Sequence, residues 1–145
     1  MRLYTAGATS TNGGTAARPV GGLMAVASRE GFVREIGIFN TTAVACAFRI
    51  ARITAAGTPG TALDEERYET TDAAQDCTAF NSWTADATIS TASGRRCQLG
   101  AQIGSGTIFT FGSRGLHVPA GTANGIGIVP IGTGQVVEFY FDWME

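Results

Sequence analysis

The sequence offers few side chains of the kinds that perform catalysis or bind metal ions. His117 is the only histidine, and the three cysteines, Cys46, Cys77 and Cys97, show no C-x-x-C spacing. Structural zinc sites take four nitrogen or sulfur ligands, which this set does not provide in any recognisable spacing. A Ser-His-Asp triad built on His117 lacks the G-x-S-x-G motif that would place a serine nucleophile. We therefore expect a solvated or interfacial histidine, and we do not expect an enzyme.

Charge and glycine patterns also argue against the common cofactors and against nucleic acid. All ten basic residues are arginine, which excludes a Schiff-base lysine and a Walker lysine. The glycine-rich segment "GIGIVPIGTG" matches no dinucleotide-binding fingerprint, so no cofactor is expected. Twelve acidic residues nearly balance the ten arginines, which gives no general electrostatic attraction to nucleic acid or to an anionic membrane. No apolar run approaches the ~20 residues of a membrane span.

One stretch is strongly acidic. Six carboxylates lie within thirteen residues, and Arg67 is the only basic residue among them, which gives a net charge of −5. Calcium binding would need the D-x-D-x-D-G spacing that brings such ligands together, and that spacing is absent. We interpret the stretch as a solvated loop or as a loop that faces a basic partner. Its candidate interface residues are Asp64, Glu65, Glu66, Arg67 and Tyr68.

The elements that must position these residues are predicted to be strands. From Leu23 onward, short apolar runs are separated by turn residues, which is typical of an all-β sandwich or barrel. The last run, 135–143, alternates apolar and polar residues and predicts a closing strand with a buried aromatic side. We predict a two-sheet antiparallel sandwich of jelly-roll-like topology. The nine candidate strands are 23–27, 32–40, 43–53, 87–91, 95–104, 107–112, 116–120, 125–131 and 135–143.

Two segments fall outside this β pattern. Residues 1–22 have little to bury and are predicted to be an extended arm, with Arg2, Tyr4 and Arg18 as anchors on a partner. The remainder, 23–145, is predicted to be one domain. Within it, residues 54–87 form a long irregular insertion, with a helical turn near Leu63–Tyr68 as its only candidate element. Because the insertion contains Trp83 and other aromatic residues, we expect it to be packed. Gly104–Gly106 and Gly132–Gly134 are expected to be hairpin turns.

Two stretches carry a resemblance, "GTPGTALDEERYETTDAAQDCTAFNSW" and "LGAQIGSGTIFTFGSRGLHVPAGTANGIGIVPIGTGQVVEFYFDW". They resemble small β-sandwich virion proteins of tailed actinobacterial phages, over roughly residues 31–145. The resemblance implies a capsid decoration or cement protein that binds the major capsid protein on the capsid exterior and has no catalytic residues. It also implies small symmetric oligomers, and a homotrimer is the first expectation. The low charged fraction of 15% suits a surface that other proteins cover.

Other functions stay open at this point. A minor tail or baseplate component is the first alternative. A module that binds host-surface carbohydrate would expose Trp83 and Tyr140 along a groove. An enzyme centred on His117 is the weakest alternative. Assembly in a reducing bacterial cytoplasm predicts three reduced cysteines, with Cys46 and Cys97 buried on apolar strand faces.

Overall fold

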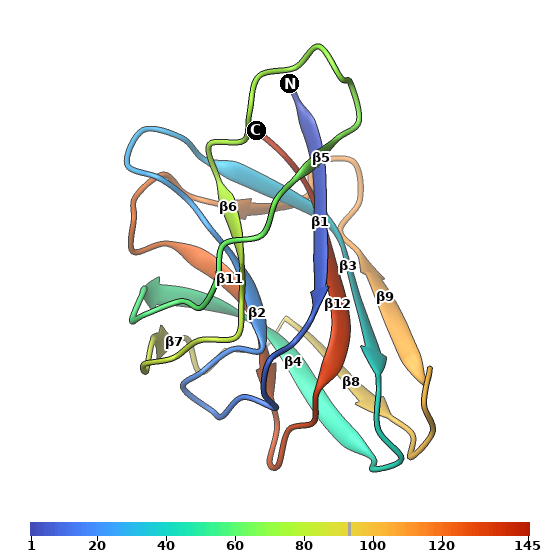
Figure 1. The fold of residues 1–145 in the computed structure, drawn as a ribbon. Helices are drawn as coiled ribbons and strands as arrows, with labels where there is room; N and C mark the ends of the chain where they lie inside the picture. The colour runs from blue at the N-terminus through green and yellow to red at the C-terminus, as the bar shows by residue number, and fades with distance from the viewer. Residues whose placement is uncertain (93) are drawn as a thin grey trace.

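A computed structural model describes residues 1–92 and 94–145 as two antiparallel β-sheets packed against each other (Figure 1). This confirms the predicted all-β, two-sheet sandwich. The first sheet has the order β10 (Leu116–Val118), β3 (Gly31–Asn40), β12 (Val137–Met144), β1 (Leu3–Thr9) and β5 (Glu66–Arg67), and β9 (Gly106–Thr110) also pairs with β3. The second sheet has the order β6 (Thr78–Asn81), β2 (Gly21–Met24), β11 (Gly125–Pro130), β4 (Cys46–Ala55) and β7 (Thr88–Ile89), and β8 (Arg95–Leu99) also pairs with β4.

The closing strand β12 is central to the first sheet rather than at its edge. It pairs with β3 on one side and with β1 on the other. The apolar side of its alternating pattern points into the space between the sheets, where Phe139, Phe141 and Trp143 are buried. The rings of Phe139 and Phe141 meet edge to face with their centroids 6.1 Å apart. At roughly 25 cal/mol per Å² of buried apolar area, these three rings contribute several kcal/mol to stability.

The expectation of a detached arm at residues 1–22 is wrong. Strand β1 pairs with β12 along its whole length, from Leu3 opposite Met144 to Thr9 opposite Glu138, and the two chain ends lie side by side (Figure 1). Tyr4 is fully buried and stacks on Trp143 with a centroid distance of 5.6 Å. One tyrosine and two small alanines suffice for the inner side of β1, because the neighbouring β12 supplies the large rings.

The segment 54–87 is not wholly irregular as expected, because its residues 78–81 form β6 at the edge of the second sheet. Its last part is packed, as predicted, and covers part of the outer face of that sheet. Trp83 is buried there with Met24, Ile53 and Ala87 in a small cluster separate from the main core. Its indole Nε1 donates a hydrogen bond to the carbonyl oxygen of Ala56 at 2.6 Å. The insertion therefore buries a large ring on the outer side of this sheet.

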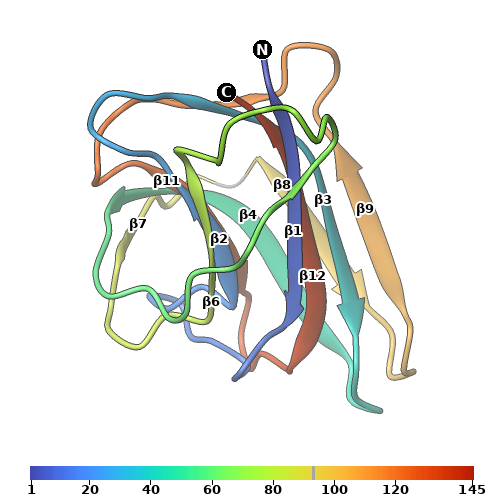
Figure 2. The same ribbon diagram turned by 45° about the horizontal axis from the view of Figure 1, so that its top comes forward.

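The segment Leu63–Tyr68 is extended and does not form the expected helical turn. Glu66 and Arg67 form β5, which pairs with Thr5 and Tyr4 of β1, and the insertion runs alongside that strand (Figure 2). Without this pairing the backbone N–H and C=O groups of β1 would face solvent at an open sheet edge. Tertiary pairing therefore decides the local conformation.

The two glycine turns cross between sheets and are not hairpins. The turn at Gly104–Gly106 leads from β8 in the second sheet to β9 in the first, and the turn at Gly132–Gly134 leads from β11 to β12. The chain also changes sheets after every strand from β1 to β5. Neighbouring strands are therefore mostly distant in sequence.

Strand β4 begins three residues later than predicted and β8 ends five residues earlier, and Asn40 binds the connections at both of these points. Its buried side-chain Nδ2 donates to the carbonyl oxygen of Val44 at 2.7 Å and to that of Gly100 at 3.0 Å. Val44 therefore lies in the connection before β4 and is 53% exposed. Beyond the end of β8, Ile103 is 76% exposed rather than buried.

The buried position of Tyr4 predicts a large stability effect from a single substitution. We expect Tyr4→Ala to lower the free energy of unfolding by about 3–5 kcal/mol, as for other buried aromatic residues. Thr5→Ala is the matched control, because Thr5 lies on the opposite side of the same strand, and its effect should stay within about 0.5 kcal/mol. Urea unfolding followed by circular dichroism measures both. Equal stability of the two variants would show that β1 is not part of the core.

Candidate protein-interaction surface

The three residues predicted to anchor the N-terminal segment on a partner instead contact other parts of the same chain. Tyr4 is buried, so the expectation that it meets a partner is wrong; its hydroxyl donates to the carbonyl oxygen of Ala73 at 2.9 Å. Arg2 forms an ion pair with Asp76, with Nη2 and Oδ2 3.0 Å apart. Arg18 forms an ion pair with Asp86, with Nε and Oδ1 2.6 Å apart. These contacts fasten residues 1–22 to the insertion.

The acidic stretch lies beside β1 and is largely solvated. Asp64, Glu66, Arg67 and Tyr68 are exposed. Glu65 is half-buried and pairs with Arg67 at 3.5 Å between Oε1 and Nε. Hydrogen bonds from its own backbone N–H and from that of Gln75, together with the Arg67 charge, lower the pKa of Glu65. The stretch is largely solvated, and two of its half-buried carboxylates, Glu65 and Asp76, form their ion pairs with arginines of the same chain.

A cluster that the sequence did not suggest fixes the acidic stretch to both chain ends. The buried Glu145 carboxylate accepts hydrogen bonds from the backbone N–H groups of Asp76 at 2.6 Å and Cys77 at 2.7 Å. Arg2 and Arg29 both reach Oδ2 of Asp76 at 3.0 Å. Cys77 is fully buried, and burial followed by the nearby Glu145 carboxylate raises its pKa to about 12.

The outer face of the first sheet carries an apolar layer, which we call the aromatic face: Phe39, Ile108 and Tyr140, with Gly37 and Gly106 between them. Ile108, Gly37 and Tyr140 lie directly opposite one another on β9, β3 and β12. In the next row, Gly106 lies opposite Phe39. Ile108 is 51% exposed, and Phe39 and Tyr140 are partly exposed. The insertion that covers the second sheet leaves this layer open to solvent.

The two glycines allow the rings to lie flat on the sheet. A Cβ atom at Gly37 would collide with the ring of Tyr140, and one at Gly106 would collide with the ring of Phe39. An aromatic ring that covers a glycine on the neighbouring strand also shields the sheet backbone from water. The result is a smooth apolar layer rather than a groove.

Three carboxylates surround the aromatic face, on β3 and β12. Each accepts a hydrogen bond from a hydroxyl group: Tyr140 donates to Glu35, Thr9 to Glu138 and Tyr68 to Asp142. Burial, together with the Glu35 carboxylate, raises the pKa of the Tyr140 hydroxyl. No ion pair to these three carboxylates is found within residues 1–92 and 94–145. The face therefore combines apolar area with negative charge that has no basic partner there.

The side chains that could act in catalysis or bind a metal ion do not lie together in one site. His117 is exposed, its Nε2 lies 2.9 Å from Oε2 of Glu30, and its ring stacks on Phe32. All three thiols are free; Cys46 is buried as predicted, but Cys97 is only half-buried because β8 lies at the edge of its sheet. Within the described part of the chain, no three His, Cys, Asp or Glu side chains are grouped so as to hold a metal ion. None of the described residues belongs to a helix of the length and hydropathy that a membrane span requires.

Carbohydrate binding along exposed rings is contradicted for one of its two aromatic residues, because Trp83 is only 1% exposed beneath the insertion. Comparisons with protein-family models, with curated proteins and with solved structures gave no match.

The Cys77 environment predicts a reactivity order for the thiols. At about pH 8 an ordinary thiol, with a pKa near 8.5, is partly ionised and reacts with iodoacetamide. Cys77 should stay unmodified, because its raised pKa keeps it protonated and burial blocks access. Half-buried Cys97 should be alkylated first, and all three thiols should react in urea. Peptide mass spectrometry over a time course gives the order; early labelling of Cys77 would show that the insertion is not fixed to the chain ends.

Proposed function

We propose that this chain is a structural virion protein, a capsid decoration protein that binds the major capsid protein lattice on the capsid exterior and stabilises the head. The observation that carries the proposal is the contrast between the two outer sheet faces. The chain covers part of the second sheet with its own insertion around Trp83, whereas the rings of the aromatic face of the first sheet stay partly exposed. A contiguous apolar surface of this kind is a mark of protein–protein contact.

The shape and charge of the aromatic face indicate which kind of partner surface would be complementary to it. The flat rings suit an equally flat apolar surface, and the carboxylates of Glu35, Glu138 and Asp142 suit basic side chains around it. Their hydrogen bonds to hydroxyl groups hold the side chains in place before binding, which lowers the entropy cost of association. We therefore assign the aromatic face to the contact with the major capsid protein.

The strand order supports the same class of protein. We take eight principal strands in chain order: β1, β2, β3, β4, β8, β9, β11 and β12. The first sheet then has the order first, eighth, third, sixth, and the second sheet has the order second, seventh, fourth, fifth. We propose that this is a jelly roll, an architecture that occurs in viral capsid and lectin domains.

The rest of the proposal rests on the resemblance in sequence. It includes assembly in the bacterial host cytoplasm and a homotrimer at symmetric lattice positions. A minor tail or baseplate component is the alternative, in which the same face would contact a tail protein. A carbohydrate-binding module has less support, because Trp83 is not available to a ligand.

A matched pair of isoleucine substitutions tests the assignment of the aromatic face. Ile108→Asp puts a carboxylate on the most exposed apolar residue of the face, whereas Ile103→Asp puts one at an exposed position outside it. Both side chains are exposed, so we expect both variants to keep the wild-type melting temperature. Loss of an interface contact worth about 2 kcal/mol would weaken binding to heads about thirtyfold for Ile108→Asp only.

The measurement is co-sedimentation of the purified variants with heads and, separately, with tails of the virions that contain this protein. Binding of the wild type to heads with selective loss in Ile108→Asp supports the proposal. Wild-type binding to tails alone would favour the tail alternative. Equal binding of both variants to heads would remove the aromatic face from the interface.

A further inference from the structure

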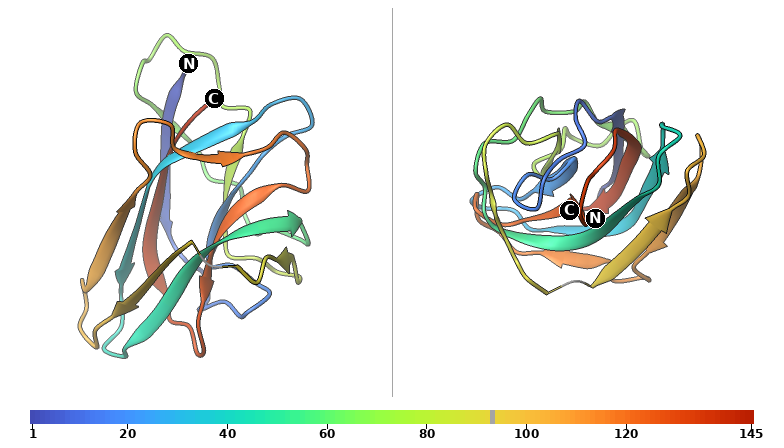
Figure 3. Two further views of the ribbon diagram at one scale, coloured as in Figure 1. Left: turned by 180° about the vertical axis from the view of Figure 1, so that it is seen from behind. Right: turned by 90° about the horizontal axis from the view of Figure 1, so that it is seen from below.

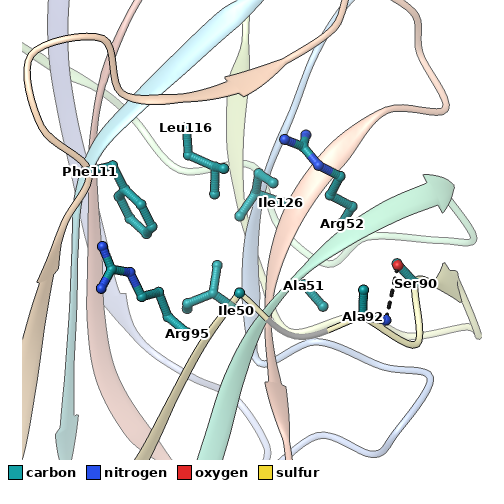
Figure 4. A pocket seen from close by; sticks show the side chains of 10 residues that line it. Ile50, Ala51, Arg52, Ser90, Ala92, Arg95, Phe111, Leu116 and Ile126 are labelled. Atoms are coloured by element: carbon teal, nitrogen blue, oxygen red, sulfur yellow. Dashed lines mark hydrogen bonds between the residues drawn. The ribbon is translucent and has the colours of Figure 1, made fainter.

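An apolar pocket of about 320 Å³ lies between the two sheets at their open edge. Its walls come from both sheets: Ile50 and Ile126 from the second, Leu116 and Phe111 from the first and the segment after β9. Arg52 and Arg95 lie on opposite sides of it, with the aliphatic side chains between them (Figure 4). The volume is at the lower end of the range for small-molecule sites, which are mostly apolar with a few placed polar groups.

The pocket forms because both sheets change their edge strand at the same level. On β4, pairing passes from β8 at Ile50 to β7 at Ile53. On β3, pairing passes from β9 at Glu35 to β10 at Val33. Seen from behind, β10 lies above β9 along β3, and β7 and β8 lie toward opposite ends of β4 (Figure 3). The edges separate at this level, and the core does not fill the space.

Each arginine is held in place by a carbonyl group of the opposite sheet. Arg52 Nη1 donates to the carbonyl oxygen of His117 at 2.6 Å, and Arg95 Nη2 donates to that of Thr110 at 3.4 Å. The Arg95 guanidinium also lies 5.7 Å from the centre of the Phe111 ring. A guanidinium has five N–H donors, so each keeps donors that can bind an anion at the mouth.

The charge of the pocket has one sign. None of its described lining residues is Asp or Glu, in a chain whose net charge is −2. Two guanidinium groups beside apolar walls are complementary to a molecule with an anionic head and an apolar body. Guanidinium groups bind carboxylates through two parallel hydrogen bonds, and apolar walls exclude the water that would compete.

We propose that this pocket binds a small carboxylate on a compact apolar body, such as an aryl-alkanoate. The carboxylate lies at the mouth, where both guanidinium groups attract it, and the apolar body rests against Ile50, Leu116 and Ile126. This inference is independent of the proposed function, since the pocket lies on the inner side of the first sheet and the aromatic face on its outer side.

Three probes separate the contributions of charge and apolar area. The protein is titrated with 4-phenylbutyrate, with the neutral 4-phenylbutanol and with butyrate, which lacks the ring, and amide shifts are followed by ¹H–¹⁵N NMR. We expect 4-phenylbutyrate to shift the pocket amides and to bind at least about tenfold more tightly than either analogue. Its affinity should fall as salt rises from about 0.05 to about 0.5 M, because salt screens the partly exposed guanidiniums.

Neighbouring arginines on β8 provide a matched control. Arg95→Gln should weaken 4-phenylbutyrate binding about tenfold or more, and Arg52→Gln should do the same. Arg96→Gln removes the same charge from the adjacent position, which lines a different, outward-facing surface, and should leave binding unchanged. The salt series on the wild type tests the charge contribution even where an arginine variant folds poorly.

The outcomes decide the proposal clearly. Tight binding of 4-phenylbutyrate, weakened by Arg52→Gln and Arg95→Gln but not by Arg96→Gln, supports it. Equal binding of 4-phenylbutanol would show an apolar hole without anion recognition. Equal binding of butyrate would show a surface anion site without the pocket. Shifts outside the pocket, or none at all, would also overturn it.

Discussion

The burial of the β12 rings between the sheets is the interaction on which the rest of the structure depends. Phe139, Phe141 and Trp143 project from one strand into the main core, and that strand has β3 and β1 as its two neighbours. Because β12 fills so much of the core, β1 needs only Tyr4 and small side chains on its inner side. The first and last strands are thereby joined, and the ends of the chain can hold the acidic insertion through Asp76, Cys77 and Glu145.

Strand β12 also positions a residue of the aromatic face on its outer side. Tyr140 alternates with the buried rings, so packing of the core fixes the position of a ring on the outer face. Gly37 beneath it and Gly106 beneath Phe39 keep that face flat. On the second sheet the corresponding large ring, Trp83, comes from the insertion and is covered by it. A ring of the second sheet's outer side is thus buried by the chain itself, whereas the rings on the first sheet's outer side stay partly exposed, and the proposed attachment to a partner rests on this difference.

The local pattern of apolar and polar residues predicted the class of fold. It could not predict which strands pair with each other, because the pairing partners lie far apart in the sequence. The alternation of Phe139, Phe141 and Trp143 is visible in the sequence, and it correctly gave a strand with one buried side. Strand β1 escaped prediction because its inner side is poor in large residues and its partner lies at the far end of the chain. A glycine-rich turn has the same sequence pattern whether the strand after it pairs with the strand before it or belongs to the other sheet. The aromatic face combines residues from β3, β9 and β12, and only the strand order brings them together.

The pocket and the aromatic face have a common element in β9. On its outer side this strand presents Ile108, and two residues later the carbonyl group of Thr110 accepts the hydrogen bond from Arg95. An edge strand that pairs with β3 on one side only has few other restraints, so the arginine on the facing sheet helps to fix where the strand lies. The Arg95 guanidinium at the pocket thus contacts the same strand that carries Ile108 of the aromatic face. A chain with so few charges uses these arginines at a gap that apolar packing leaves open, where each can bridge the sheets and still keep donors for a ligand.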